Sequence, residues 1–485
     1  MPAARVGCII ASVTRLDERM HRAAAIGVLA WLALGHATAG DGRTAGASCD
    51  PRHDLAVEAH PDEALYGADA VRADLAQLLS VVAATHPDPD LTFDHAQLRR
   101  TQRELGAALP ARMNVREAWL AMARLNPHFH DAHTGLRHPI AAYEASLAAG
   151  SAAFPVPVLV DRDGRLRASA AVDPRTGLAA YDRIASINGR ETAGIIADLM
   201  PRMRGETESI QRLVLAFNFP GHLWTLLGPQ RAYCVGVETG NGERRHVLLA
   251  GVAGDAAPRP RGRISSAFGL SMPAPDVALL RVGSFDPGLK DAFAAFLEES
   301  FAALDASGAK TLLIDLRDNP GGAHDVSDLL IGYLTDREIP TASMLLARIN
   351  DDNRELAPDA EAGSVVRVPF REPIERRTSR APFEGGVYVV VSRDTYSQAI
   401  VFAATLKDAG IARIIGEVTG GNANQTGQIV VKPLANTGLQ ALAPLYVIYR
   451  PNGDTAMAGL QPDIPLAHDP LAPQRMIEAA LDAIE

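Results

Sequence analysis

The 485-residue sequence is poor in aromatic residues (5%) and has no excess of basic ones, since 47 Lys and Arg face 57 Asp and Glu for a net charge of −10. A surface of this sign repels phosphate groups, which argues against nucleic acid or an anionic lipid surface as the partner. No apolar run approaches the roughly 20 residues that cross a bilayer, which argues against a stable membrane span. Hydrophobic content of 47% with 21% charged residues is typical of a globular protein of two or three domains.

Cysteine is also scarce, with residues only at Cys8, Cys49 and Cys234. Cys8 belongs to the N-terminal segment discussed next. Cys49 and Cys234 could pair in an oxidising compartment, but their separation in sequence leaves the pairing open.

The N-terminus is typical of a secretory signal. An apolar run, residues 23–34, follows Arg19 and Arg22 and precedes the small-residue pattern Ala37-Thr-Ala39. We therefore predict cleavage after Ala39 and export to the periplasm or beyond, with Met20 as an alternative start. Cleavage removes four arginines and two acidic residues, a net of +2, so the mature charge is −10 − 2 = −12.

Composition and periodicity divide the rest of the chain into four parts. Residues 40–67 have no periodic pattern of apolar residues, which predicts a flexible leader. Apolar residues at helical spacing predict a helical domain over 68–145. Short alternating runs predict a β module over 150–256. Apolar strands alternate with helices over 262–485, which indicates βαβ units in a mainly parallel sheet, with residues 341–382 as an insertion.

Ser397 lies where an apolar strand, Gly386 to Val391, gives way to an apolar helix. Such an elbow exposes the hydroxyl above the sheet, beside the free N–H groups of the helix start that can hold an oxyanion. The same residue could instead cap the helix. A second strand ends in Asn319-Pro-Gly-Gly322, a turn whose glycines let a ligand approach the backbone.

Six blocks of sequence, in order and spacing, resemble the tail-specific, or C-terminal processing, serine peptidases. They are Asp131-Ala-His-Thr134, Asp315-Leu-Arg-Asp-Asn-Pro-Gly-Gly322, Thr395-Tyr-Ser-Gln-Ala399, Gly416-Glu-Val-Thr-Gly-Gly421, Leu434-Ala-Asn-Thr-Gly-Leu439 and Gly459-Leu-Gln-Pro-Asp-Ile464. The resemblance implies an α/β fold with a crotonase-like (ββα) catalytic core, an N-terminal helical region and a PDZ-like β module. It also implies cleavage of peptide or protein substrates through an acyl-enzyme on Ser397, without a cofactor or metal.

The segment from Leu178 to Thr192 is similar to the Gly-Asp-x-Ile-x-x-Ile-Asn-Gly signature of PDZ domains, with Tyr181 where glycine is usual. A generic small β-domain remains the alternative.

The general base is assigned by comparing two branches of the family. Processing peptidases place a lysine where this chain has Asn422, 25 residues after the serine. Members resembling the tricorn core and the interphotoreceptor retinoid-binding protein use a histidine instead, and His133 occupies the matching position in the Asp-x-His block. Imidazole titrates near neutral pH and suits the role.

The resemblance places the oxyanion hole at backbone N–H groups of Gln398 and of the glycine turn, Gly321 first and Gly322 next. The acid that orients His133 is unassigned, because Ala456 stands where histidine-using relatives have glutamate. Asp454 and Glu417 are the candidates.

Two alternatives stay open at this stage. The run His128-Phe-His-Asp-Ala-His133 has the density of a metal site, but it follows a helical stretch and has its aspartate one place early for a metallo-β-lactamase-like hydrolase. The scaffold could also serve a non-catalytic ligand- or peptide-binding protein, since fold alone does not fix function. Oligomeric state is not predicted.

Overall fold

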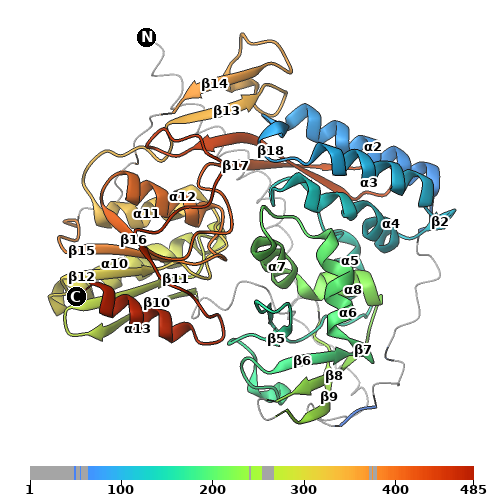
Figure 1. The fold of residues 1–485 in the computed structure, drawn as a ribbon, viewed down its shortest axis with the longest axis horizontal. Coiled ribbons are helices and arrows are strands. Elements are labelled where there is room, and N and C mark those ends of the chain that lie inside the picture. Colours follow the sequence, from blue (N-terminus) through green and yellow to red (C-terminus); the bar gives the residue numbers. More distant parts are fainter. Residues whose placement is uncertain are drawn as a thin grey trace, which may run out of the picture.

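The computed structural model describes residues 48–50, 55, 64–239, 242–253, 267–370, 374 and 380–484. The signal segment and its cleavage site lie outside these residues, as does most of the leader. Figure 1 shows three regions that follow one another along the chain: helices at the N-terminus, a small sheet with helices in the middle, and a larger α/β region at the C-terminus.

The N-terminal region is helical, as predicted. It contains α2 (Ala68–Thr85), α3 (His95–Ala108), α4 (Val115–Met122) and α5 (Ile140–Ala148), with the 3-10 helix η2 (Ala123–Phe129) between the last two. Asn114 and Glu117 form a capping box at the start of α4, which explains why the helix begins there. The two-residue strands β1 (Tyr66–Gly67) and β2 (Arg112–Met113) pair with each other.

The middle region is a β-sheet of order β4-β5-β6-β8-β9, with β7 paired to β6. Its strands are β4 (Val158–Val160), β5 (Leu166–Ala168), β6 (Arg183–Ile187), β7 (Arg190–Glu191), β8 (Ala232–Glu238) and β9 (Arg244–Ala250). Three helices, α6 (Thr192–Leu199), α7 (Glu208–Phe217) and α8 (Phe219–Leu227), lie between β7 and β8 in the sequence. Cys49 and Cys234 form a disulfide that ties the leader to β8.

The C-terminal region contains the predicted parallel sheet, of order β10-β11-β12-β15-β16-β19, in which only β10 runs antiparallel to its neighbour. The strands are β10 (Phe268–Ala274), β11 (Val277–Val282), β12 (Thr311–Asp315), β15 (Gly386–Val391), β16 (Ala412–Gly416) and β19 (Ile464–Pro465). Helices α10 (Lys290–Ser307), α11 (His324–Leu334) and α12 (Gln398–Asp408) pack on one face, and α13 (Pro473–Ile484) on the other. Strands covered on both faces read as continuous apolar runs, as β15 does.

A second sheet stands above the first, with the order β14-β13-β18-β17. It consists of β13 (Met344–Arg348), β14 (Val365–Pro369), β17 (Gln425–Pro433) and β18 (Gln440–Tyr449). The segment 341–382, which the sequence marked as an insertion, therefore contributes β13, which pairs with β18, and β14, which pairs with β13. The short strand β3 (Gly135–Leu136) of the N-terminal region also pairs with β18.

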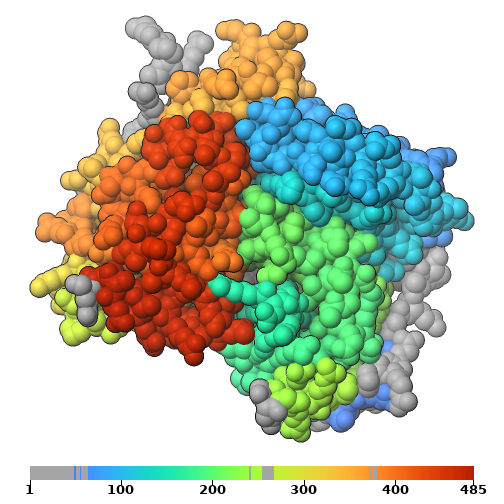
Figure 2. Space-filling model, viewed as in Figure 1, coloured from blue at the N-terminus to red at the C-terminus, as the bar shows by residue number. Residues whose placement is uncertain are grey.

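The three regions are packed against one another, and Figure 2 shows the blue helices and the green middle region in contact with the red C-terminal residues. Asp74 of α2 is fully buried and accepts four hydrogen bonds from Asn436 and Thr437 in the β17–β18 turn. One apolar core joins the helical and middle regions to that turn, and a second surrounds the parallel sheet and includes Ala132 and Ile210. The described part of the chain contains no helix long and apolar enough to cross a membrane.

Two buried histidines lie where the N-terminal helices meet α8. The rings of His138 and His222 are 5.0 Å apart and are enclosed by Trp119, Tyr143 and Trp224. Burial lowers the pKa of His138 to about 4 and holds the pKa of His222 well below its usual value. Both imidazoles are therefore neutral in the folded protein at neutral pH.

We expect this pair to make the protein acid-sensitive. A histidine with a lowered folded pKa stabilises the fold fully above its unfolded pKa of about 6.5, and that contribution is lost as pH falls toward 4. For His138 alone the loss between pH 7 and pH 5 is about 2 kcal/mol of unfolding free energy. Denaturant unfolding at the two pH values should show a smaller loss in His138→Phe. The exposed His95→Phe serves as control, and an equal loss in wild type and His138→Phe contradicts the prediction.

Candidate active site

Ser397 lies at the elbow between β15 and α12. Its backbone has φ 51° and ψ −125°, a conformation that residues other than glycine rarely adopt. The preceding loop is fixed to the end of β12, because Ser392 Oγ donates to Arg317 O and Thr395 Oγ1 donates to Leu316 O. The hydroxyl of Ser397 makes no helix-capping hydrogen bond. It lies 3.2 Å from His133 Nε2 instead.

His133 reaches Ser397 from a turn that precedes β3. Asp131 shapes this turn: its carboxylate accepts hydrogen bonds from the His133 N–H at 2.8 Å and from Thr134 Oγ1 at 2.6 Å. The next residues form β3 and join the second sheet, which fixes the turn beside the C-terminal region. The imidazole is buried and stacks on the ring of Tyr396, with centroids 5.3 Å apart.

The second imidazole nitrogen of His133 faces a hydroxyl and a carboxylate. Nδ1 lies 3.1 Å from Thr426 Oγ1, which donates to Asp131 Oδ1 at 2.8 Å, and the direct distance from Nδ1 to Asp131 Oδ1 is 3.5 Å. Burial alone would raise the pKa of Asp131, but hydrogen bonds from His133 and His86 hold it well below its usual value. Asp131 is therefore ionised at neutral pH.

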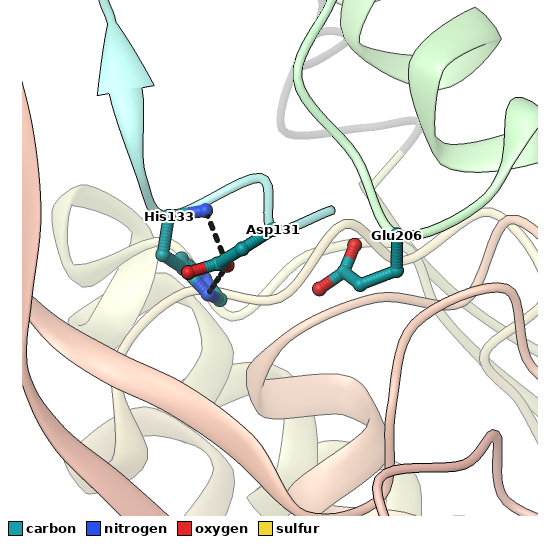
Figure 3. A group of neighbouring side chains, drawn as sticks. All are labelled: Asp131, His133 and Glu206. Atoms are coloured by element: carbon teal, nitrogen blue, oxygen red, sulfur yellow. Dashed lines mark hydrogen bonds and ion pairs between the residues drawn. The ribbon is translucent and has the colours of Figure 1, made fainter. Parts of the chain in front are cut away.

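A second carboxylate, Glu206, approaches the same imidazole. Its side chain points toward Asp131 and His133 (Figure 3), and its Oε1 accepts a hydrogen bond of 3.0 Å from the Tyr396 hydroxyl. That hydroxyl lies 3.4 Å from His133 Nδ1. Burial, followed by the charge of Asp131, raises the pKa of Glu206 to about 8.

Asp131, His133 and Glu206 each offer one potential metal-ligand atom, and these atoms lie within 4.8 Å of one another. The hydroxyls of Thr426 and Tyr396 lie between them and link them by hydrogen bonds. The arrangement is therefore that of a hydrogen-bond network around one imidazole. The other histidines of the run do not join it, since His128 Nε2 pairs with Thr101 Oγ1 at 3.0 Å and His130 is exposed.

The glycine turn lies directly against Ser397. A Cβ at Gly321, whose φ is +96°, would come within 2.8 Å of both Ser397 Cβ and the Gln398 nitrogen. The Gly321 N–H already donates to Asn319 Oδ1 at 2.8 Å. Gly322 lies opposite Phe285 in a parallel bridge whose hydrogen bonds to Phe285 are made by the residues on either side of Gly322. The N–H of Gly322 itself therefore points away from Phe285. No described residue accepts a hydrogen bond from the N–H of Gly322 or of Gln398, the first residue of α12.

The two acids that the sequence offered lie elsewhere. Asp454 is exposed, and its carboxylate accepts a hydrogen bond from the Ala456 N–H. Glu417 pairs with Arg162 at 2.6 Å and with Arg393 at 3.4 Å, and it lines a cleft of about 470 Å³ between β4, α7 and the loop before Ser397. The described contacts of the His133 ring are with Ser397, Thr426, Tyr396 and Asp131.

Sequence reasoning missed the roles of Asp131, Thr426, Tyr396 and Glu206 around the imidazole. Asp131 and Tyr396 stand inside blocks that were recognised, so proximity to His133 and Ser397 in the sequence was an available clue. Thr426 and Glu206 lie in segments without any recognised pattern, and only the folded chain brings them to the site.

Comparison with known proteins identifies a family match and a shared fold. Residues 276–466 match Peptidase family S41. The structure of mature CPAF complexed with lactacystin is 17% identical, covers 86% of this chain and 97% of that chain, and has a TM-score of 0.57. A CPAF mutant structure is 16% identical, covers 86% of this chain and 96% of that chain, and has a TM-score of 0.59. The photosystem II D1 C-terminal processing protease is 16% identical, covers 82% of this chain and 93% of that chain, and has a TM-score of 0.45. At such identities the CPAF structures establish a shared fold, and the family match includes Ser397 but not His133.

The close approach of Gly321 to Ser397 leads to a prediction. Gly321→Ala should slow labelling of Ser397 by a serine-reactive fluorophosphonate about 100-fold, because the new Cβ separates the turn from the start of α12 and displaces the oxyanion donors. Gly363→Ala is the matched control, since Gly363 has a similar φ of +84° and open space around its Cβ position. Equal labelling rates for the two variants would contradict the prediction.

Proposed function

This chain carries a peptidase domain of family S41 and is a serine-type peptidase, and we propose that Ser397 is its nucleophile and His133 its general base. The observation that carries the proposal is the 3.2 Å distance between Ser397 Oγ and His133 Nε2, two atoms whose residues are 264 positions apart. A base within hydrogen-bond reach is what a serine needs to become nucleophilic.

The geometry supports an acyl-enzyme mechanism. His133 Nε2 accepts the hydroxyl proton as Ser397 Oγ attacks the peptide carbonyl carbon, and the imidazolium then protonates the departing amine. Water, deprotonated by the same imidazole, releases the acyl group from Ser397. The N–H groups of Gln398 and Gly322 are the better placed oxyanion donors, because the Gly321 N–H is engaged by Asn319.

We assign the orienting acid to Asp131. Its ionised carboxylate binds the Thr426 hydroxyl, whose oxygen can in turn accept the His133 Nδ1–H. This chain of two hydrogen bonds leaves Nε2 unprotonated and facing Ser397, the tautomer that a general base requires. Asp454 and Glu417, which the sequence offered for this role, are engaged elsewhere.

We further propose that residues 262–485 form a crotonase-like catalytic domain and residues 150–256 a PDZ-like module, with the helical domain at 68–145. In support of the PDZ-like assignment, Tyr181 has φ +67°, the left-handed conformation expected where the PDZ signature has glycine. The turn Asn188-Gly189 between β6 and β7 also has positive φ at both residues, as a two-residue hairpin requires.

The nucleophile assignment is tested by intact-mass analysis after fluorophosphonate treatment. Wild type should gain one probe mass, Ser397→Ala none, and His133→Ala should react at least about 100-fold more slowly because the serine has lost its base. Ser364→Ala and His95→Ala are controls outside the site. A folded wild-type protein that stays unlabelled would instead favour a non-catalytic ligand- or peptide-binding protein on this scaffold.

We also propose that the protein is exported. The cleavable signal pattern before Gly40 and the disulfide between Cys49 and Cys234 support an oxidising destination such as the periplasm. A full-length protein expressed in a bacterium with an active export system should appear in the periplasmic fraction with Gly40 as its first residue. Thiol alkylation without reduction should modify neither cysteine; a cytoplasmic protein with its N-terminus intact would refute export.

A further inference from the structure

Glu206 comes from a part of the chain that the peptidase mechanism above does not use. The segment Arg204–Thr207 leads from the middle sheet to α7 and passes through the site. Arg204 donates a hydrogen bond to Ala132 O, next to His133, and Thr207 Oγ1 donates to Gly420 O at 3.0 Å. These contacts hold Glu206 between the turn of His133 and the loop of Gly420.

The Tyr396 hydroxyl links Glu206 to the imidazole and has only one proton to donate. It lies 3.0 Å from Glu206 Oε1 and 3.4 Å from His133 Nδ1. Burial, with the charge of Glu206, raises the pKa of Tyr396 well above its usual value, so the hydroxyl stays protonated. Which neighbour receives that proton depends on whether Glu206 is ionised, because a carboxylate only accepts whereas a carboxylic acid also donates.

We propose that Glu206 and Tyr396 form a protonation-dependent switch that positions the proton of His133. With Glu206 ionised, Tyr396 donates to the carboxylate, and its oxygen shares the Nδ1–H of His133 with Thr426 Oγ1. Nε2 is then free to take the proton of Ser397. With Glu206 protonated, the acid donates to the Tyr396 oxygen, and Tyr396 donates to Nδ1. The imidazole proton then sits on Nε2, where it blocks deprotonation of Ser397. The inference rests on Ser397 and His133 acting as proposed above.

The switch acts within a physiological range of pH. Besides Tyr396, the charged or titratable groups that face Glu206 are Asp131, His133 and Arg204. Burial and the negative charge of Asp131 raise the pKa of Glu206 to about 8, while buried Arg204, with its pKa lowered to about 10, remains a cation. Because Thr426 and Asp131 favour the productive tautomer at every pH, the switch shifts the tautomer populations and modulates the reaction rather than abolishing it.

The test is the rate of fluorophosphonate labelling from pH 6 to pH 9.5, which requires no knowledge of the substrate. Wild type should label about fivefold faster above a step near pH 8 than below it, the equivalent of one hydrogen bond. Glu206→Gln, which cannot ionise, should lack the step and stay at the slow level. Tyr396→Phe should also lack the step but stay at the fast level, because nothing donates to Nδ1.

The opposite plateaus of the two variants separate a switch from a purely structural role, which would slow both variants and preserve the step. Glu208→Gln is the matched control, since Glu208 is an exposed acid two residues away that pairs with Arg212. The switch alone is overturned if the rate step near pH 8 survives in Tyr396→Phe, or if wild type is labelled without showing the step. Wild type that is not labelled at any pH overturns the nucleophile assignment and the switch with it.

Discussion

The pairing of β3 with β18 is the contact on which the proposed active site depends. Leu136 and Gly135 lie opposite Ala441 and Leu442, so the turn that ends in His133 becomes an extension of the C-terminal sheet. β17, the neighbour of β18, carries Thr426 to the far side of the same imidazole. Pairing on both sides of β18 thus fixes the proposed base and the hydroxyl that orients it, although the serine belongs to a different sheet.

The serine is held just as tightly by its own surroundings. Ser397 keeps a backbone conformation that residues other than glycine rarely adopt, and such strain persists only where neighbouring contacts over-determine it. Those contacts come from Ser392 and Thr395, whose hydroxyls bind the end of β12. They also come from Gly321, which packs so closely on Ser397 that a side chain at position 321 has no space. As a consequence, the Ser397 hydroxyl faces the His133 imidazole, although a serine at the start of a helix would by itself favour capping that helix.

The sequence predicted those strands and site residues that carry a local pattern, either a continuous apolar run or a recognisable block. The apolar strands of the parallel sheet were predictable because residues buried on both faces form continuous runs, and Ser397 and His133 stood inside recognisable blocks. Two neighbours of His133 were not predictable, because Thr426 and Glu206 carry no local signature and reach the imidazole only through sheet pairing and the passage of residues 204–207. Asp454 lies two residues from Ala456 in the sequence, but nearness in sequence says nothing about the direction in which an exposed turn projects its carboxylate.

The contact of Asp74 with the β17–β18 turn links the first helix of the described residues to nearly the last strand, a separation of 363 residues. Contacts of such long range form late, since their loop-closure entropy is opposed only once most of the chain is in place. The N-terminal helices therefore dock on the second sheet only once the β17–β18 turn and β18 are in place. Without β18, the segments that carry His133 and Thr426 share no strand pairing, so the arrangement around the imidazole depends on residues far along the chain from the helices.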